Sequence, residues 1–433
     1  MIGKVFYNAG SQLVGKGFTA GATLLVTLFI GRALGPQGFG EFTKIFVYVG
    51  YFYIVTDFGL NSIFVKGAQE KSLVSSLKVL VGLRLSLSLV FALLAVLIAS
   101  FLPHDPNLAT GFSPTVKIGI ALASLTIVTH ALYTTANAFF QKKLRYDLST
   151  IAAIVASTVV LLVTIAVSAR AASPLPYVFA YVAGGATLVF VAYLLIRQKS
   201  GEFVLPVFDL GKFKESFSSA WPIGLALIFN LIYFRIDVFI LASVRPSGEV
   251  GLYGLAYQFF EATLAVPIFF ANAIFPLLIQ SYKRGLGPLR AQLAKWLGLM
   301  FLVSLVATVL LFGASFLIPA IYDSRFEGSG AALQILALGL PFFFISVLLW
   351  HLLIIYEKQR YLIPIYGFGA AFNLVANLLL IPIWGYLAAA AITVVSEAII
   401  LVLLALVSIR MIFPPPAEER GEHGGSGYSP SRK

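Results

Sequence analysis

The sequence predicts an all-α integral membrane protein, with about 12 transmembrane helices in two parallel six-helix lobes around a central cavity. Of its 433 residues, 59% are hydrophobic and 11% are charged, whereas soluble domains carry roughly a quarter charged residues. Apolar runs of about 20 residues, long enough to cross a hydrocarbon core of roughly 30 Å, recur along the chain. The runs lack the alternation of barrel strands, so helices must satisfy the backbone.

Twelve apolar runs, separated by charged residues, proline or glycine, define the predicted spans. Six form an N-terminal lobe (1–200) and six a C-terminal lobe (217–410), joined by a cytoplasmic linker (201–216). Residues 411–433 are rich in Pro, Gly, Ser and charge, which predicts a disordered cytoplasmic tail. The spans start near Val14, Thr43, Val79, Thr115, Thr150, Tyr177, Phe217, Leu252, Leu293, Ala331, Leu362 and Tyr386.

The basic residues predict the orientation of these spans. Four of the 30 Lys and Arg residues lie within spans, five lie in segments on one side, and the other 21 lie on the side that holds both termini. Because Lys and Arg are enriched in cytoplasmic segments, we expect a multi-pass protein of the cytoplasmic (inner) membrane with both termini in the cytoplasm. This bias absorbs most of the net charge of +12, so nucleic acid is not an expected partner. The opposite side holds Arg32, Lys117, Arg170, Arg245 and Arg325.

Two short patterns occur twice in the chain. FGEF at 39–42 resembles VGLY at 250–253, and KLRY at 143–146 resembles KQRY at 358–361. The copies are 211 and 215 residues apart, which predicts a duplicated six-helix unit with the same orientation in both halves. Two such lobes around a cavity are typical of transporters.

Several function classes are excluded by missing residue types. The chain has no cysteine and four scattered histidines, which excludes disulfides, thiolate catalysis and a His-cluster metal site. No metal or other cofactor is expected. A membrane glycosyltransferase or polymerase needs a catalytic loop or a metal-binding carboxylate pair, and the sequence has neither a long loop nor an Asp-x-Asp motif. We therefore do not expect an enzyme.

Ionisable side chains within the spans indicate a hydrated cavity, because each costs a few kcal/mol or more in hydrocarbon unless it is paired or hydrated. Lys16 lies near a span end, where its ammonium can equally reach the membrane surface. Arg235 and Asp237 point about 200° apart around a helix, so each is expected to meet a different partner. The residues well within spans are Asp57, Arg84, Arg235, Asp237, Glu261 and Glu397.

Polar residues also recur at helical spacing. In the first span they form a continuous stripe, which is expected to face away from lipid. Interhelical hydrogen bonding is the alternative explanation for such stripes. Glu397 can pair with Arg84 or Arg235, or act as a proton site, and the sequence leaves these open. The stripe of the first span comprises Gln12, Lys16, Thr19, Thr23 and Thr27.

Three stretches resemble a known family. Leu24–Gly67 contains LGP-x-x-F-G followed by DFGL, and it is similar to the opening of the polysaccharide biosynthesis or oligosaccharide flippase family, which includes O-antigen flippases. Arg235–Phe259 (RIDVFILASVRPSGEVGLYGLAYQF) resembles the start of that family's second lobe. Asn373–Glu397 resembles its N…N…IP…G…AA…SE stretch. The resemblance extends over the whole membrane region.

The resemblance implies the fold of the multidrug/oligosaccharidyl-lipid/polysaccharide exporter superfamily. It further implies a flippase that carries a polyprenyl-diphosphate-linked oligosaccharide across the membrane by alternating access. Its expected partners are this lipid-linked oligosaccharide, membrane lipids and the polysaccharide polymerase machinery. Relatives that move lipid II have two additional spans, so the twelve predicted here argue against lipid II as substrate.

For such a substrate, the cationic side chains of Lys16, Arg84 and Arg235 are expected to offset the diphosphate charge in the cavity. Tyr53, Tyr233 and Tyr257 are expected to stack on sugars. Coupling to an H⁺ or Na⁺ gradient would use Asp57, Asp237, Glu261 or Glu397. The alternative function is a multidrug or organic-cation antiporter of the same superfamily, for which acidic residues should dominate the cavity.

Overall fold

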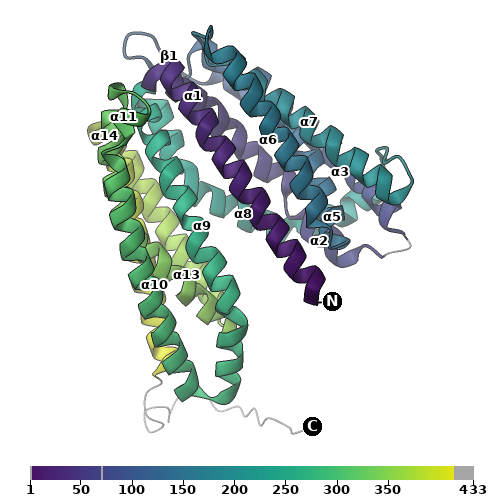
Figure 1. Ribbon diagram of the computed structural model, residues 1–433, viewed down its shortest axis with the longest axis vertical. Helices are drawn as coiled ribbons and strands as arrows, with labels where there is room; N and C mark the ends of the chain where they lie inside the picture. Colours follow the sequence, from purple (N-terminus) through teal and green to yellow (C-terminus); the bar gives the residue numbers. More distant parts are fainter. Residues whose placement is uncertain (1, 70–71, 414–433) are drawn as a thin grey trace.

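The computed structural model describes residues 2–69 and 72–413 and consists almost entirely of helices. The predicted tail falls mostly on residues 414–433, which lie outside the described residues. Two helical lobes meet at one end and diverge toward the other, so the molecule has the outline of a V (Figure 1). The N-terminus lies toward the diverging end, which we call the open end, and the opposite end is the closed end.

The N-terminal lobe contains seven helices and one short hairpin among the described residues. The hairpin lies at the closed end and pairs β1 with β2 in antiparallel register, with His104 opposite Gly111. The elements are α1 (Ile2–Asp57), α2 (Leu60–Gly67), α3 (Leu73–Phe101), β1 (His104–Asp105), β2 (Thr110–Gly111), α4 (Pro114–Ala123), α5 (Leu125–Lys142), α6 (Tyr146–Ser168) and α7 (Leu175–Ser200).

The C-terminal lobe follows after a non-helical linker. Residues 201–209 form this linker, and α8 begins earlier than the predicted span because the Asp209 side chain accepts a hydrogen bond from the Lys212 backbone N–H (3.1 Å). The elements are α8 (Leu210–Val244), α9 (Ser247–Arg284), α10 (Leu286–Ser315), α11 (Ile318–Ile321), η2 (Ser324–Phe326), α12 (Glu327–Leu338), α13 (Leu340–Ile355), η3 (Gln359–Tyr361) and α14 (Leu362–Ile412).

Two long helices each supply two of the predicted spans. Within the described residues, nine helical segments are long and apolar enough to cross a membrane, and two of these are 54 residues long. The long segments bend at Gly35 (φ 61°) and Gly385 (φ 63°), in the left-handed region that glycine adopts without steric cost. Each of the two long segments corresponds to two predicted spans, and α8 corresponds to the seventh span. The described helices therefore match the twelve predicted spans.

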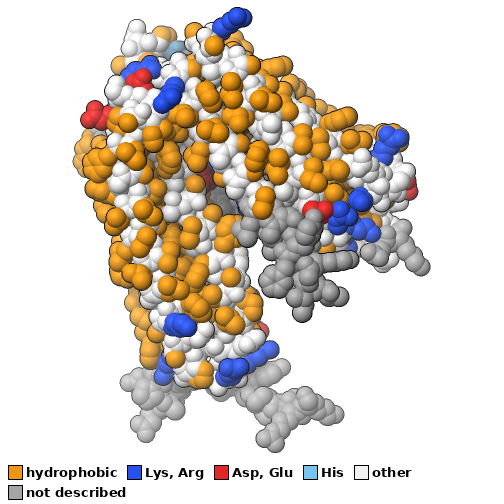
Figure 2. Space-filling model, viewed as in Figure 1, with side chains coloured by type: hydrophobic (Ala, Val, Ile, Leu, Met, Phe, Trp, Pro, Cys, Tyr) orange, Lys and Arg blue, Asp and Glu red, His pale blue; other side chains and the backbone are white. Residues whose placement is uncertain are grey.

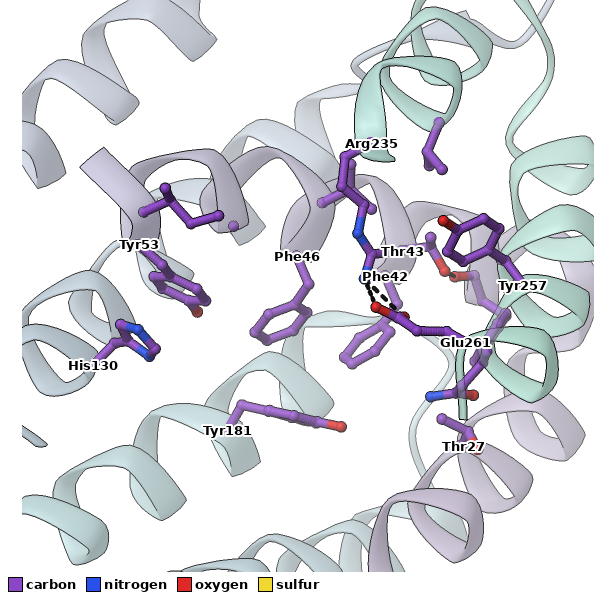
Figure 3. Close-up of a pocket in the computed structure, with 17 residues that line it drawn as sticks. Thr27, Phe42, Thr43, Phe46, Tyr53, His130, Tyr181, Arg235, Tyr257 and Glu261 are labelled. Atoms are coloured by element: carbon purple, nitrogen blue, oxygen red, sulfur yellow. Dashed lines mark hydrogen bonds and ion pairs between the residues drawn. The ribbon is translucent and has the colours of Figure 1, made fainter. Parts of the chain in front are cut away.

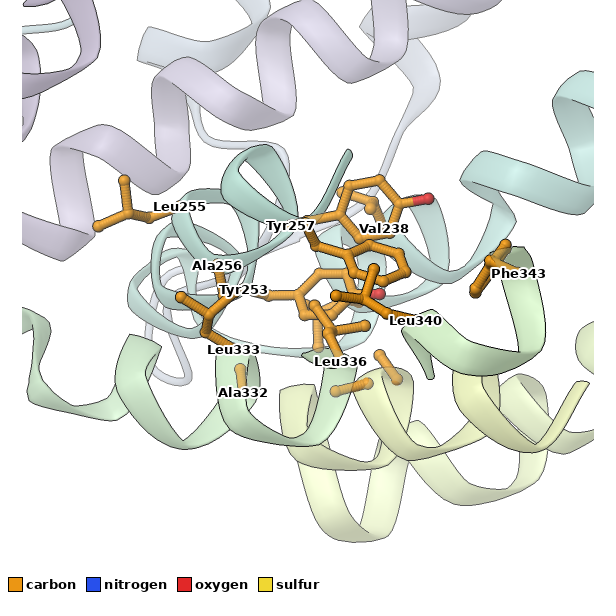
Figure 4. Close-up of a cluster of buried hydrophobic side chains, with 14 of the residues drawn as sticks. Val238, Tyr253, Leu255, Ala256, Tyr257, Ala332, Leu333, Leu336, Leu340 and Phe343 are labelled. Atoms are coloured by element: carbon orange, nitrogen blue, oxygen red, sulfur yellow. The ribbon is translucent and has the colours of Figure 1, made fainter. Parts of the chain in front are cut away.

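Apolar residues lie both in the cores and on the outer surface. Figure 4 shows part of the C-terminal core, where Tyr253, Leu336 and Leu340 are fully buried between helices. The outer faces are also apolar: Leu93 on α3 and Val309 on α10 are about 70% exposed. Figure 2 shows hydrophobic side chains over both lobes. So large an exposed apolar surface identifies the outer faces as lipid-facing.

The duplicated glycines meet where the lobes cross at the closed end. A Cβ added to Gly40 on α1 would lie 1.6 Å from the Ser247 carbonyl oxygen on α9, and one added to Gly251 would lie 2.1 Å from the Pro36 oxygen. Real Cβ atoms do not approach other heavy atoms so closely. The two helices therefore pack backbone to backbone, and glycine at both positions permits it.

Hydrogen bonds between the lobes add to this crossing. The Arg32 Nε donates to the Ile321 carbonyl (2.8 Å), and the β2 residue Thr110 forms a bridge with Pro246 at the start of α9. Near Ile321, the Arg325 guanidinium donates to Asp323 (3.0 Å) and holds the pKa of that exposed carboxyl below its ordinary value. The closed end thus has its own set of specific contacts.

The helix α8 links the lobes. The Val207 N–H donates to the Lys78 carbonyl (3.0 Å), which fixes the linker against α3. Further along, Phe217 on α8 stacks on Phe58 of the N-terminal lobe, with ring centroids 4.6 Å apart and planes 4° from parallel. The C-terminal half of α8 packs against α14 and carries Arg235. A change in the angle between the lobes must therefore move α8.

Candidate functional site

A cavity of about 490 Å³ lies between the lobes. The N-terminal lobe contributes residues of α1, α5 and α7, and the C-terminal lobe contributes residues of α8 and α9 (Figure 3). The lining residues are Thr27, Phe39, Phe42, Thr43, Phe46, Val47, Gly50, Tyr53, Ile54, His130, Tyr181, Arg235, Val238, Gly254, Tyr257, Gln258 and Glu261.

Aromatic rings form the N-terminal wall of this cavity. Tyr181 on α7 lies 4.7 Å from Phe46 and 5.6 Å from Phe42, centroid to centroid. Tyr53 stacks on His130 at 4.5 Å, with the ring planes 17° apart, and its hydroxyl hydrogen-bonds to the Thr126 hydroxyl (2.6 Å). Because these contacts hold each ring in one orientation, the wall offers preformed aromatic surfaces to a bound molecule.

The opposite wall carries an ion pair. The Arg235 Nη2 donates to both carboxylate oxygens of Glu261, at 2.7 and 2.8 Å, and the guanidinium lies 5.2 Å from the Tyr257 ring (Figure 3). Both side chains keep solvent access, 33% for Arg235 and 52% for Glu261. The Tyr51 hydroxyl donates to the Arg235 carbonyl (2.7 Å) and so fixes this turn of α8 from the other lobe.

Four of the residues predicted for the site line this cavity: Tyr53, Arg235, Tyr257 and Glu261. The side chain of a fifth, Tyr233, lies outside the described residues. The sequence reasoning missed Phe42, Phe46, Tyr181 and Gln258, because an aromatic residue of a membrane helix has the same pattern whether it faces lipid or a cavity. The spacing of Phe42 and Phe46 by four residues was the one available signal.

Arg84 and Asp57 were predicted to face the central cavity, but the structure places them elsewhere. Arg84 is fully buried inside the N-terminal lobe, donates to the Asp57 carboxylate and to the Ala131 carbonyl (3.3 Å), and is not among the described residues that line the cavity. Asp57 ends α1, directly before the left-handed residues Phe58 and Gly59. The pair joins α3 to this bend. Arg84 is fully buried and Asp57 is 26% exposed, so loss of the Asp57 carboxylate would leave a buried guanidinium without its counter-charge, which costs about 3–5 kcal/mol.

Asp237 and Glu397 lie within the C-terminal lobe, also away from the described cavity lining. Asp237 is buried behind the wall and accepts hydrogen bonds from the Tyr253 and Thr393 hydroxyls. The prediction that Arg235 and Asp237 meet different partners is confirmed. Glu397 is buried on α14, and Arg84 and Arg235 pair instead with Asp57 and Glu261.

Lys16 lies outside the main cavity. It lines a smaller cavity of the N-terminal lobe, and its Nζ is 4.6 Å from the centre of the Phe269 ring on α9. Among the described residues, no group of three or more His, Cys, Asp or Glu side chains is placed to hold a metal ion.

Two six-helix lobes with a polar and aromatic cavity between them define the class: an integral membrane protein with the two-lobe architecture that is typical of transporters. The chain belongs to the polysaccharide biosynthesis protein family, whose sequence model matches residues 5–282. No curated protein sequence matches it significantly.

Solved structures share this fold. The lipid II flippase MurJ in an inward closed conformation is 13% identical, with a TM-score of 0.73 over 91% of this chain and 87% of its own. An inward-facing multidrug resistance MATE transporter is 11% identical, with a TM-score of 0.69 over 90% and 94%. A MOP superfamily transporter from Pyrococcus furiosus is 12% identical, with a TM-score of 0.59 over 94% and 95%. At such identities the likeness concerns the fold.

Proposed function

We propose that the protein is a flippase that moves a polyprenyl-diphosphate-linked oligosaccharide from the cytoplasmic to the outer leaflet by alternating access. It acts as a transporter, not an enzyme, in the cytoplasmic membrane and supplies the polysaccharide polymerase machinery. The family assignment supports this function. The observation that carries it is the combination of one guanidinium, Arg235, with an aromatic wall in a single cavity between the lobes.

Arg235 is the proposed anchor for the diphosphate. A guanidinium presents forked donors that match phosphate oxygens, and it keeps its charge at all relevant pH values. In the structure Glu261 accepts hydrogen bonds from the Arg235 guanidinium. A diphosphate must replace this carboxylate, and protonation of Glu261 favours the exchange. This competition provides the proposed coupling to an H⁺ gradient.

The aromatic wall is the proposed surface for the sugars. Sugar rings present apolar C–H faces that pack on aromatic rings, and Tyr53, Phe46 and Tyr181 offer such faces. The buried Gln258 amide oxygen accepts no hydrogen bond from any described residue. A sugar hydroxyl can donate to it, which would satisfy a buried polar atom.

The proposed orientation places the open end at the cytoplasm. Helices α5, α7 and α9 run toward this end (Figure 1), and their last turns carry basic residues such as Lys142, Arg197 and Lys283. The positive-inside tendency then supports a cavity that faces the cytoplasm, from which the lipid-linked substrate arrives. The polyprenyl tail remains in the bilayer while the head group occupies the cavity.

The alternative, an organic-cation antiporter, is less well supported. Among the described lining residues Glu261 is the one acidic residue, and its charge is neutralised by the ion pair with Arg235. An organic cation would need a net negative cavity, because its desolvation must be offset by an unpaired carboxylate. The described lining therefore has no net charge and offers no unpaired carboxylate to a cation, whereas an anionic head group that displaces Glu261 gains the Arg235 guanidinium.

Reconstitution tests the proposal. Proteoliposomes with the full chain should move a polyprenyl-diphosphate-linked oligosaccharide from the outer to the inner leaflet, measured as loss of access to an externally added glycan-cleaving enzyme. Protein-free liposomes give the background rate. Transport of an organic cation on a proton gradient, without movement of the glycolipid, would replace the proposal with the antiporter function.

A further inference from the structure

A second cavity, of about 220 Å³, lies within the N-terminal lobe, between α1, α5 and α6. All but two of its lining residues are polar, which is unusual inside a lobe whose outer faces are apolar. The lining consists of Gln12, Gly15, Lys16, Thr19, Tyr133, Asn137, Tyr146, Ser149, Thr150 and Ala153.

The charge of this cavity is positive. Lys16 is exposed, and no carboxylate in the described part of the chain lies within ion-pair distance of its Nζ. Among the described residues, the Lys16 ammonium has a cation–π contact with the Phe269 ring. This contact stabilises the charge less than an ion pair with a bound anion would. No acidic residue lines the cavity. The field therefore favours an anion.

A hydrogen-bond chain orients the neutral groups. The Tyr133 hydroxyl bonds to the Ser149 hydroxyl (2.8 Å), which donates to the Asn137 Oδ1 (2.8 Å). This chain fixes the Asn137 amide so that its oxygen is occupied. Its N–H groups have no acceptor among the described residues and remain available as donors. A cation, an amide donor and several hydroxyls are the groups that bind a phosphorylated sugar.

The polar stripe of α1 connects the two cavities. Lys16 and Thr19 line the smaller cavity, Thr27 lines the main one, and the exposed Thr23 lies between them. Lys16 and Thr27 are about 16 Å apart along the axis at a rise of 1.5 Å per residue. Thr19 and Thr23 donate to carbonyls of their own helix, so their oxygens stay free to accept.

We propose that the second cavity is a loading site, which holds the diphosphate and first sugar of the substrate before the head group moves along α1 to Arg235. This inference rests on the proposed function and extends it by a separate site. An anionic phospholipid head group shares the phosphate chemistry, so the experiment must distinguish the two sources.

The test measures binding separately from transport. The full-length chain with Arg235→Ala, which removes the proposed anchor of the main cavity, is placed in phosphatidylcholine nanodiscs. The probe is a farnesyl-diphosphate-linked hexose. Adding Lys16→Met should raise the Kd of the probe about tenfold, the loss expected for one charge-assisted contact. Asn137→Leu should also raise it. Lys283→Met, which removes an exposed lysine at the same end of the other lobe, should not. Inorganic pyrophosphate should compete with the probe, whereas phosphatidylglycerol in the nanodisc should not.

Two results would overturn the loading site: an unchanged Kd in Lys16→Met and Asn137→Leu, or displacement of the probe by phosphatidylglycerol as effective as by pyrophosphate. The proposed function has a separate criterion, which is flipping by the unmodified chain. If flipping fails while Lys16-dependent binding of the probe remains, the flippase proposal is wrong and the phosphosaccharide site stands.

Discussion

Replacing Gly40 with alanine is expected to prevent the lobes from closing at the end where they now meet. The added methyl group would lie 1.6 Å from the Ser247 carbonyl oxygen, and the neighbouring contact, the Gly251 backbone nitrogen at 2.9 Å, is also main chain. No side-chain rotation relieves such an overlap, so α1 and α9 must separate. Flipping should fall to the rate of protein-free liposomes, because the arrangement in which the lobes meet at this end can no longer form.

A distance measurement checks the structural part of this prediction. The chain has no cysteine, so Asn107→Cys in the hairpin and Ser324→Cys in η2 can carry spin labels without background. Both residues are exposed and belong to different lobes at the closed end. Gly40→Ala should lengthen the label distance, whereas Gly21→Ala, on the same helix, outside both cavities and with open space around its added Cβ, should not. Equal distances and equal flipping in both variants would refute the role of the crossing.

Loss of the Arg235 guanidinium is expected to reduce flipping about ten- to hundredfold, because hydrogen bonds to a charged group contribute about 1.5–3 kcal/mol. Arg235→Lys keeps the charge but lacks the forked donors, so an intermediate rate is expected. Glu261→Gln removes the competing carboxylate, and the rate should then depend less on the proton gradient. Initial flipping rates in proteoliposomes, with and without a gradient, measure all three effects.

Lys214→Ala is the matched control for these variants, because it removes an exposed cation from the same helix outside the cavity. It should flip at the unmodified rate. Retention of full flipping by Arg235→Ala in correctly folded protein would mean that the diphosphate is held elsewhere. A Glu261→Gln variant with unchanged gradient dependence would remove Glu261 from the coupling step.

The fold could be predicted from the sequence because membrane helices are defined by length and hydropathy, which are local properties. The two-lobe arrangement followed from the repeated motifs, and Gly40 and Gly251 do meet at the crossing. The bends were harder to place. At Gly35, followed by Pro36, the sequence indicates a break between spans, but the positive φ of the glycine lets the helix continue in a new direction.

The site was only partly predictable. A charged residue in an apolar run must have a partner or water, but the sequence does not show which partner it has. Arg84 and Arg235 have the same appearance in the sequence: each is a lone arginine in an apolar run. Tertiary packing alone decides that Arg84 meets Asp57 in a core and that Arg235 meets Glu261 in a cavity. Tyr181 could not be predicted at all, because an aromatic residue that lines a cavity and one that faces lipid look the same in the sequence.

A reversible disulfide across the closed end tests the central claim that the lobes must exchange between two arrangements to move the glycolipid. A Cβ built on Gly254 of α9 lies 3.6 Å from the Thr43 Cβ of α1, within the range that disulfides require. The Thr43→Cys and Gly254→Cys double variant should form this bond on oxidation. The account predicts that flipping of the lipid-linked oligosaccharide stops in the oxidised protein and returns with a reductant, while each single variant is insensitive to oxidation. Unchanged flipping by fully cross-linked protein would contradict it.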